Sequence, residues 1–192
     1  MNDTDKYILD SIRTWVWSGF YSPEEVDGFI DDILEPDADE EMLRAAVLPE
    51  FEKKAAAEAS WPQRTDCDRL DEAFEELNAA GIIALHNAGY TMSDGHEDVG
   101  EELHQRGRSG IRGYCFYHGQ DLERAVQGEG LMLAFGDLDA VDDQKVVIGR
   151  EVKQALERAD LSVKWNGKPD TRIDIPKLDW KRRRRDAGDG GA

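Results

Sequence analysis

Apolar side chains recur every three to four positions over residues 1–62, a spacing that places them on one face of a helix. Ser22 supplies the start signal of a second helix, as an N-cap whose capping box is completed by Glu25. A third helix is expected from about Asp39, and Pro49 either kinks it or restarts it. The pattern predicts an all-helical N-terminal segment. The apolar positions of its first two helices are Ile8, Leu9, Ile12, Trp15, Val16, Val26, Phe29, Ile30 and Ile33.

Over residues 63–180 the pattern changes to short apolar runs separated by helical segments. A hairpin is also predicted at 163–175, where Asn166 and Gly167 form a two-residue turn between apolar positions. This alternation favours an α/β fold, with α+β as the alternative, built on a mostly parallel or mixed sheet of about five strands flanked by helices. The three inner runs are IIALHNAG at 82–89, IRGYCFYH at 111–118 and GLMLAFGD at 130–137.

The connection between the second and third inner strands, at 118–131, leaves one strand direction open. Its length of about a dozen residues is near the minimum for a right-handed crossover between parallel strands. An antiparallel pair is therefore the alternative at this point of the sheet.

Polar side chains stand where each inner strand ends, and they form the candidate site. If the strands are parallel, these ends lie along one edge of the sheet, where open α/β folds bind ligands. His118 is the candidate general base, supported by His86 and Asp121, because imidazole titrates near neutrality and a carboxylate can orient it. The candidate binding residues are Asn87, Gln120, Asp137 and Asp94.

These residues also have structural interpretations. A histidine at a strand end can bond to a loop carbonyl, and Asp121 can be a helix N-cap that contributes about 1 kcal/mol. Asp94 can likewise cap the next helix. No spacing of His, Cys, Asp or Glu matches a zinc or calcium pattern, so no metal site is predicted, and no motif identifies a cofactor. Cys115 lies mid-strand, where a thiol usually behaves as a small hydrophobe.

The formal net charge is −18, and it is uneven along the chain. Residues 1–62 carry 16 Asp and Glu against 5 Lys and Arg, whereas a basic run opens the tail at 181–192, which is expected to be disordered. An acidic protein repels nucleic acid and anionic lipid, which argues against both as partners. The basic run is a solvated terminus, a partner of the protein's own acidic face, or a nucleic-acid arm.

The sequence contains no apolar stretch of roughly 20 residues and no secretory signal pattern at its N-terminus. Its two cysteines do not make a disulfide framework. A cytoplasmic location is therefore expected.

Three segments together resemble a bacterial family of unknown function, DUF6891: GIIALHNAGYTMSDG, GIRGYCFYHGQDLERA and GLMLAFGDLD. The N-terminal WSGFYSPEEV and the C-terminal VKWNGKPDTRIDI also fit this family. The resemblance extends over most of the chain and implies a bacterial, soluble, cytoplasmic protein. It implies no activity and no catalytic residue.

The leading hypothesis is an α/β protein that binds a partner or a small ligand. One version is an immunity or antitoxin-like protein whose acidic helices cover a basic protein partner. The alternative is a small hydrolase or transferase with a histidine-based site at the sheet edge, using His118 as the base. A homodimer formed through Trp17, Phe20 and Tyr21 is a third hypothesis.

Overall fold

The structure, a computed structural model, describes residues 1–184. Its contacts divide the chain into two compact units. Residues 1–65 and 181–184 form the first, which we call the helical unit, and residues 66–180 form the second, the α/β unit. The chain therefore passes from one unit to the other twice. No helix within the described residues is long and apolar enough to cross a membrane.

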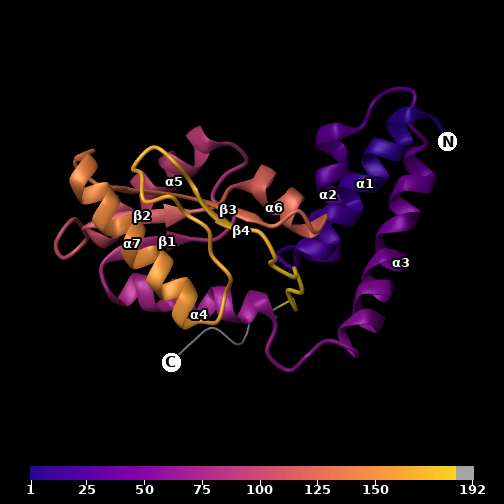
Figure 1. The fold of residues 1–192 in the computed structure, drawn as a ribbon. Helices are drawn as coiled ribbons and strands as arrows, with labels where there is room; N and C mark the ends of the chain where they lie inside the picture. Colours follow the sequence, from indigo (N-terminus) through magenta and orange to yellow (C-terminus); the bar gives the residue numbers. More distant parts are fainter. Residues whose placement is uncertain (185–192) are drawn as a thin grey trace. The chain divides into compact units, whose positions relative to one another are not determined.

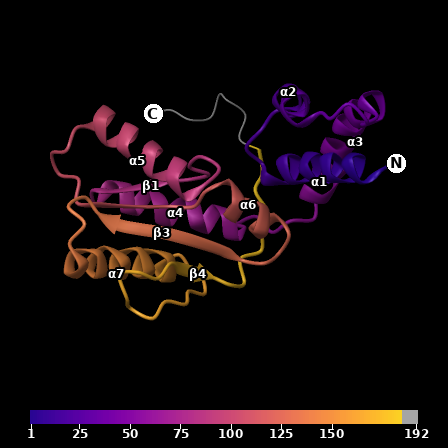
Figure 2. The ribbon, with the colours of Figure 1, turned by 90° about the horizontal axis from the view of Figure 1, so that it is seen from above.

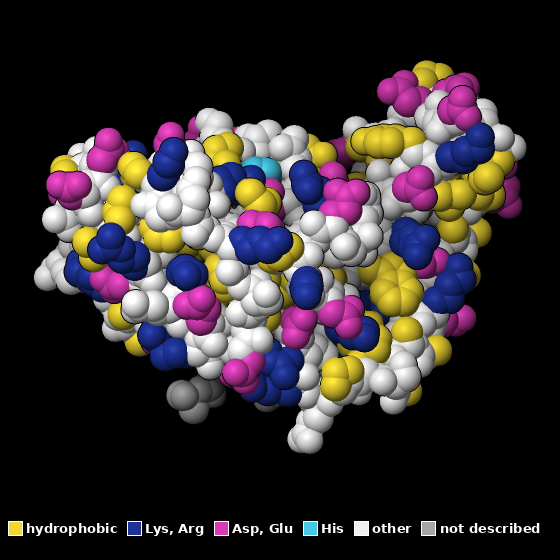
Figure 3. Space-filling model, in the orientation of Figure 1, with side chains coloured by type: hydrophobic (Ala, Val, Ile, Leu, Met, Phe, Trp, Pro, Cys, Tyr) yellow, Lys and Arg dark blue, Asp and Glu magenta, His cyan; other side chains and the backbone are white. Residues whose placement is uncertain are grey.

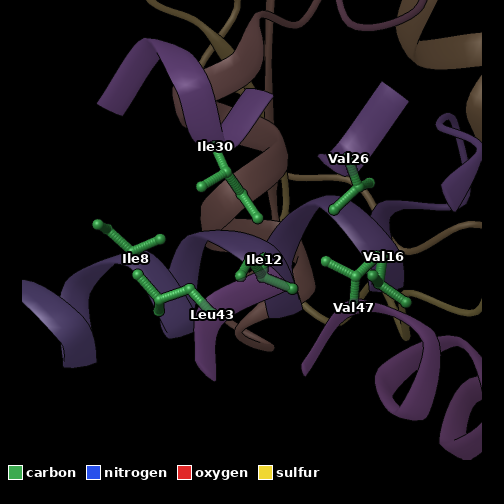
Figure 4. Close-up of a cluster of buried hydrophobic side chains, with 7 residues drawn as sticks. All are labelled: Ile8, Ile12, Val16, Val26, Ile30, Leu43 and Val47. Atoms are coloured by element: carbon green, nitrogen blue, oxygen red, sulfur yellow. The ribbon is translucent and has the colours of Figure 1, made fainter. Parts of the chain in front are cut away.

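The helical unit consists of α1 (Asp3–Ser18), α2 (Pro23–Ile33) and α3 (Glu40–Glu58), each in contact with the other two (Figure 1). Their apolar faces meet in one core, as the helical spacing predicts (Figure 4). Burial of these side chains is the main stabilising term of the unit. The core residues are Ile8, Ile12, Val16, Val26, Ile30, Leu43 and Val47.

Local sequence explains where these helices begin and end. At the start of α2, Ser22 accepts the backbone N–H of Glu25 at 3.2 Å, and the Glu25 carboxylate accepts the N–H of Ser22 at 2.7 Å. This is the predicted capping box. Gly19 ends α1 in the left-handed region, at φ +81°. Pro49 lies inside α3, which continues past it as a single helix, so of the two alternatives, a kink or a restart, the restart does not occur.

The α/β unit alternates helices with strands, as predicted. Its elements are α4 (Asp66–Ala79), β1 (Ile82–Leu85), α5 (Met92–Arg106), β2 (Gly113–Phe116), α6 (Gly119–Val126), β3 (Leu131–Asp137), α7 (Asp142–Arg158) and β4 (Ile173–Ile175).

The sheet is mixed and has the strand order β1-β2-β3-β4. β1 and β2 are parallel, whereas β2 pairs antiparallel with β3, and β3 pairs antiparallel with β4. There are four strands within the described residues rather than about five. The reason is that the first arm of the predicted hairpin makes only an isolated bridge, between Lys164 and Asp174.

The expectation that all three inner strands end at one edge is wrong for β3. After β2 the chain forms α6 and returns within a short connection, which is enough for an antiparallel return but leaves little length for a crossover. In the resulting register, Asp137 lies opposite Gly113, the first residue of β2. Asp137 is therefore at the opposite edge from the ends of β1 and β2.

Helices cover both faces of the sheet. α4 and α7 pack against each other and against β1 and β3, while α5 and α6 lie on the other face (Figures 1 and 2). Side chains at the end of β2 alternate accordingly: Phe116 contacts Gly95 of α5, and Tyr117, the residue after the strand, lies against Phe74 of α4. The two faces thus present different side chains to different helices.

The first residues of the predicted disordered tail have defined neighbours in the helical unit. Arg182 is buried and lies against Gly19 and Phe20. The rest of that prediction, from residue 185 onward, lies outside the described residues.

Candidate functional site

The ends of β1 and β2 bring two histidines to the same edge of the sheet. His86 follows β1 and His118 follows β2, and these strands are parallel. Asp137, at the other edge, instead accepts the backbone N–H groups of Asp139 and Val141 at 3.0 and 2.9 Å, just before α7. It therefore organises the turn into a helix.

Both ring nitrogens of His86 have hydrogen-bonding partners. Nδ1 lies 3.0 Å from the hydroxyl of Tyr117, and Nε2 lies 3.2 Å from a carboxylate oxygen of Asp71 in α4. The ring also stacks on Phe74, with centroids 4.4 Å apart. Because Asp71 and Phe74 belong to α4, this chain of polar groups lies on the α4 face of the sheet, and both Tyr117 and Asp71 are buried there.

His118 belongs to a different cluster, centred on Asp121. Nε2 of His118 lies 3.2 Å from the Asp121 carboxylate, which also accepts the backbone N–H of His118 at 3.3 Å. Arg172 donates to both carboxylate oxygens through its two terminal nitrogens, and its Nη2 also donates to the carbonyl of Met132 at 2.8 Å. His118 and Asp121 are 5 % and 3 % exposed, whereas the Arg172 side chain is 27 % exposed, so a buried carboxylate pairs with a partly exposed guanidinium and has an imidazole beside it.

The environment of His118 favours its neutral form. Burial lowers its pKa below the ordinary value, and the charge of Arg172 acts in the same direction, while Asp121 and Asp94 oppose the shift. In the neutral ring the proton is best placed on Nε2, 3.2 Å from the Asp121 carboxylate, which leaves Nδ1 as an acceptor. Nδ1 is buried and has no protein partner among the described residues.

The two histidines share an edge but do not share a partner. His86 is held by α4, whereas His118 is influenced by Asp94 of α5 and by Arg172, on the other face. Their different partners follow from the alternation of side chains along the two strands.

The remaining predicted residues have backbone roles. Asp94 accepts the N–H of Thr91 at 2.8 Å and completes a capping box with it, so α5 begins at Met92, earlier than the sequence suggested. These bonds lower the pKa of the Asp94 carboxyl. Asn87 adopts a positive φ of 48° at the turn after β1, and Gln120 is exposed, with its N–H bonded to the carbonyl of Tyr90.

A hollow of about 210 Å³ lies beside β3, where β4 stops short. β4 pairs only with residues 131–133. Beyond Leu133, the side of β3 that faces β4 has no partner strand within the described residues. We call this space the β3-edge hollow. Its lining includes Met92, His96, Tyr114, Phe135, Lys145, Asp170, Thr171 and Arg172.

A second hollow, of about 480 Å³, lies next to Trp165 and shares Thr171 and Arg172 with the first. Lys153 and Lys164 also line it. Thr171 and Arg172 therefore border both hollows, and Arg172 connects them to the buried carboxylate of Asp121.

Sequence reasoning missed Arg172, Lys145, His96 and Tyr114. The sequence places Arg172 only within the predicted hairpin at 163–175, 51 residues from Asp121 along the chain. The one available signal was a permanently charged residue directly before an alternating apolar strand. Burial lowers the pKa of His96, whose ring packs edge-on against Tyr114 and Phe116.

Residues 1–184 match a protein family described as "Domain of unknown function (DUF6891)". The chain belongs to the DUF6891 family. No curated protein and no solved structure matches the chain.

The DUF6891 match spans both units, including the C-terminal segment that joins the helical unit. The family resemblance read from the sequence is thus confirmed, and it brings no activity with it. Among the described residues of this DUF6891 chain, no three His, Cys, Asp or Glu side chains are grouped to hold a metal ion.

Proposed function

We propose that the α/β unit is a ligand-binding domain that takes a small anion, with a carboxylate or phosphate group, in the β3-edge hollow. The observation that carries the proposal is the pairing of Lys145 and Arg172 in its lining. These cations face one hollow of a unit that has 24 acidic and only 13 basic residues. The Asp170 carboxylate also lines the hollow, so two cations there stand against one carboxylate. A locally positive hollow in an acidic unit selects anions while the rest of the surface repels them.

Lys145 supplies most of the net positive charge. Its Nζ is 3.9 Å from the nearest paired carboxylate, that of Asp142, which is at the limit of an ion pair. Arg172 is partly neutralised by Asp121, but that pair fixes its guanidinium, and Nη1 carries a second N–H. A guanidinium held in place loses little side-chain entropy when it donates to a ligand.

The dimensions restrict the ligand. A volume of about 210 Å³ is below the roughly 300–1,000 Å³ usual for drug-sized ligands. The hollow suits an anion of a few heavy atoms, with Tyr114 and Met92 beside its apolar part.

The geometry supports binding better than the alternative of a hydrolase or transferase. A general base needs a free nitrogen or oxygen directed at a substrate. Both nitrogens of His86 are engaged, and the Asp121 carboxylate accepts from Arg172 and His118. His118 retains one acceptor, but it is buried and is not part of the lining of the hollow.

The immunity-like version, with acidic helices against a basic protein, has less support. The described helical unit has 16 acidic and 10 basic residues once residues 181–184 are included, and the α/β unit has an excess of 11 acidic residues. Figure 3 likewise shows lysine and arginine interspersed with acidic side chains on the face that it draws. A bacterial, cytoplasmic setting remains part of the hypothesis, taken from the family resemblance.

Isothermal titration calorimetry with inorganic phosphate, acetate, succinate and citrate tests the proposal. We expect saturable binding of at least one anion, weakened about tenfold in Lys145→Gln because a charge-assisted hydrogen bond is lost. Arg150→Gln is the matched control, since it removes one exposed charge from the same helix outside the hollow. Absence of saturable binding, or an equal loss in both variants, would contradict the proposal.

A further inference from the structure

We infer that the helical unit contains a binding site for two consecutive arginines, and that the chain's own residues 181–184 occupy it. The site is formed by Gly19, Phe20, Trp61 and Pro62, and we call it the arginine site. It lies outside the α/β unit and is independent of the proposed anion hollow.

Gly19 provides the floor of the arginine site. A Cβ atom placed on Gly19 would lie 2.5 Å from the carbonyl oxygen of Arg182 and 2.7 Å from its Cγ. Only glycine allows the backbone of Arg182 to approach this closely, and the positive φ at the end of α1 also favours glycine. Gly19 thus serves both as a helix cap and as a contact surface for the segment.

Arg182 is held by burial and by an aromatic ring. It is 7 % exposed, which is rare for arginine, and its guanidinium carbon lies 4.7 Å from the centroid of the Phe20 ring. This distance is within the range of a cation–π interaction, which gains strength when the cation is removed from water.

Arg183 has a ring and a carbonyl of its own. Its guanidinium carbon lies 5.7 Å from the centroid of Trp61, and its Nη2 donates to the carbonyl of Pro62 at 2.9 Å. Two aromatic rings therefore lie against two adjacent arginines, and the Nζ of Lys54 lies 5.9 Å from the centroid of the Trp61 ring as well. We expect this pairing to favour arginine over lysine, because a planar guanidinium can lie over a ring and donate sideways at the same time, as Arg183 does to the carbonyl of Pro62.

The segment resembles a bound peptide more than an element of the fold. Residues 181–184 form neither helix nor strand, and their contacts with Gly19 and Pro62 bridge more than a hundred positions in the sequence. An extended peptide with adjacent arginines offers the same groups. The ligand class is therefore an arginine-pair peptide, which competes with the chain's own segment.

Peptide binding to the full-length chain tests this inference. The probe is a fluorescently labelled peptide with the sequence LDWKRRRR, taken from residues 178–185. The receptor is the chain with Arg182→Gln and Arg183→Gln, which weakens the internal occupant. We expect this variant to bind the peptide at least about tenfold more tightly than the unaltered chain, where the occupied site reduces apparent affinity.

Two further arms measure specificity. Adding Phe20→Leu to the double variant should weaken binding of the peptide about fivefold, because the ring that lies against the first arginine is lost. A peptide with lysine in place of each arginine should bind more weakly than the arginine peptide. Equal binding by the unaltered and double-variant chains, or equal binding of both peptides, overturns the inference, because general attraction to an acidic protein would then explain the data.

Hydrogen exchange of the otherwise unaltered chain provides a second readout if the double variant loses its helical circular dichroism. Phe20→Leu should then increase amide exchange at residues 181–184 relative to Tyr7→Leu, an exposed aromatic substitution on the neighbouring helix. No difference between these two variants would overturn the inference.

Discussion

The helical unit and the α/β unit bury polar groups in different ways. In the helical unit, buried Asp5 receives backbone N–H groups from Asn2 and Asp39 at helix starts, and Lys54 pairs with Glu58 one turn away. In the α/β unit, Asp121 pairs with Arg172 across 51 positions. The first pattern stabilises individual helices, whereas the second ties distant segments together beside two hollows.

This difference indicates where each unit is vulnerable. A core of aliphatic side chains weakens gradually when volume is removed, because the surroundings relax in part. A buried charge that loses its partner has no such relaxation, and the carboxylate left behind carries the full cost of desolvation. The predictions below test this contrast, from the largest expected effect to the smallest.

The largest effect is expected from Arg172→Met, which leaves the Asp121 carboxylate buried without its counter-ion. We expect the α/β unit to lose about 4 kcal/mol of stability. Hydrogen exchange resolved by unit measures this loss. The double variant Asp121→Asn, Arg172→Met should recover much of it, since the unpaired charge is then absent. A single variant as stable as the unaltered chain would show that the pair contributes little.

In the helical unit, Leu43→Ala should cost about 3 kcal/mol, because Leu43 is fully buried among α1, α2 and α3. Leu48→Ala on the same helix is the matched control, since Leu48 is 62 % exposed and should change stability by less than about 0.5 kcal/mol. Urea titration followed by exchange at α1 amides gives the comparison. If Leu43→Ala reduced the stability of both units equally, the two units would unfold together.

A smaller effect is expected from Ser22→Ala, which removes the side-chain cap of α2. The loss should be about 1 kcal/mol, and Ser22→Asp should keep the stability near that of the unaltered chain because aspartate is an equally good cap. Thermal unfolding monitored by circular dichroism distinguishes the two variants. Equal melting temperatures for the two variants would mean that packing, and not the side-chain cap, stabilises the start of α2.

The smallest effect in this series is a difference in stability between the two units in mild acid. All four histidines lie in the α/β unit. Because burial lowers the pKa of His96 and His118 below the ordinary 6.5, the unfolded chain takes up protons first as pH falls. Stability of the α/β unit is therefore complete above about pH 6.5 and decreases below it, while that of the helical unit holds until its carboxylates titrate.

Urea midpoints measured between pH 7 and 5 check this sign. His96→Gln should reduce the dependence of the urea midpoint of the α/β unit on pH. A rise in its stability on acidification would contradict the assignment of neutral histidines.

Local signals in the sequence predicted most of the elements. The bounds of α1 and α2 follow within a few residues from their apolar spacing and from the residues at their ends, Gly19, Ser22 and Glu25. The sequence also predicts a mixed sheet with flanking helices. Strand direction was not determined, because an apolar run such as that of β3 is compatible with either pairing. For this reason the sequence predicts Asp137 at the same edge as His86 and His118, whereas it lies at the opposite edge.

The candidate site was predicted less completely than the fold. His86 and His118 were correctly placed after parallel neighbours, yet their partners Asp71, Tyr117 and Arg172 come from other elements. Pairing between distant positions leaves no local pattern in a single sequence. The hollow beside β3 depends on where β4 stops, which is set by the tertiary pairing itself.

The passage of the chain from the helical unit to the α/β unit and back has a consequence for biosynthesis. A ribosome makes α1, α2 and α3 first, but Arg182 and Arg183 emerge only after every strand of the sheet has been translated. The helical unit, begun before the α/β unit, is therefore completed after it. Until Arg182 and Arg183 have been made, Gly19, Phe20 and Trp61 are not covered by them.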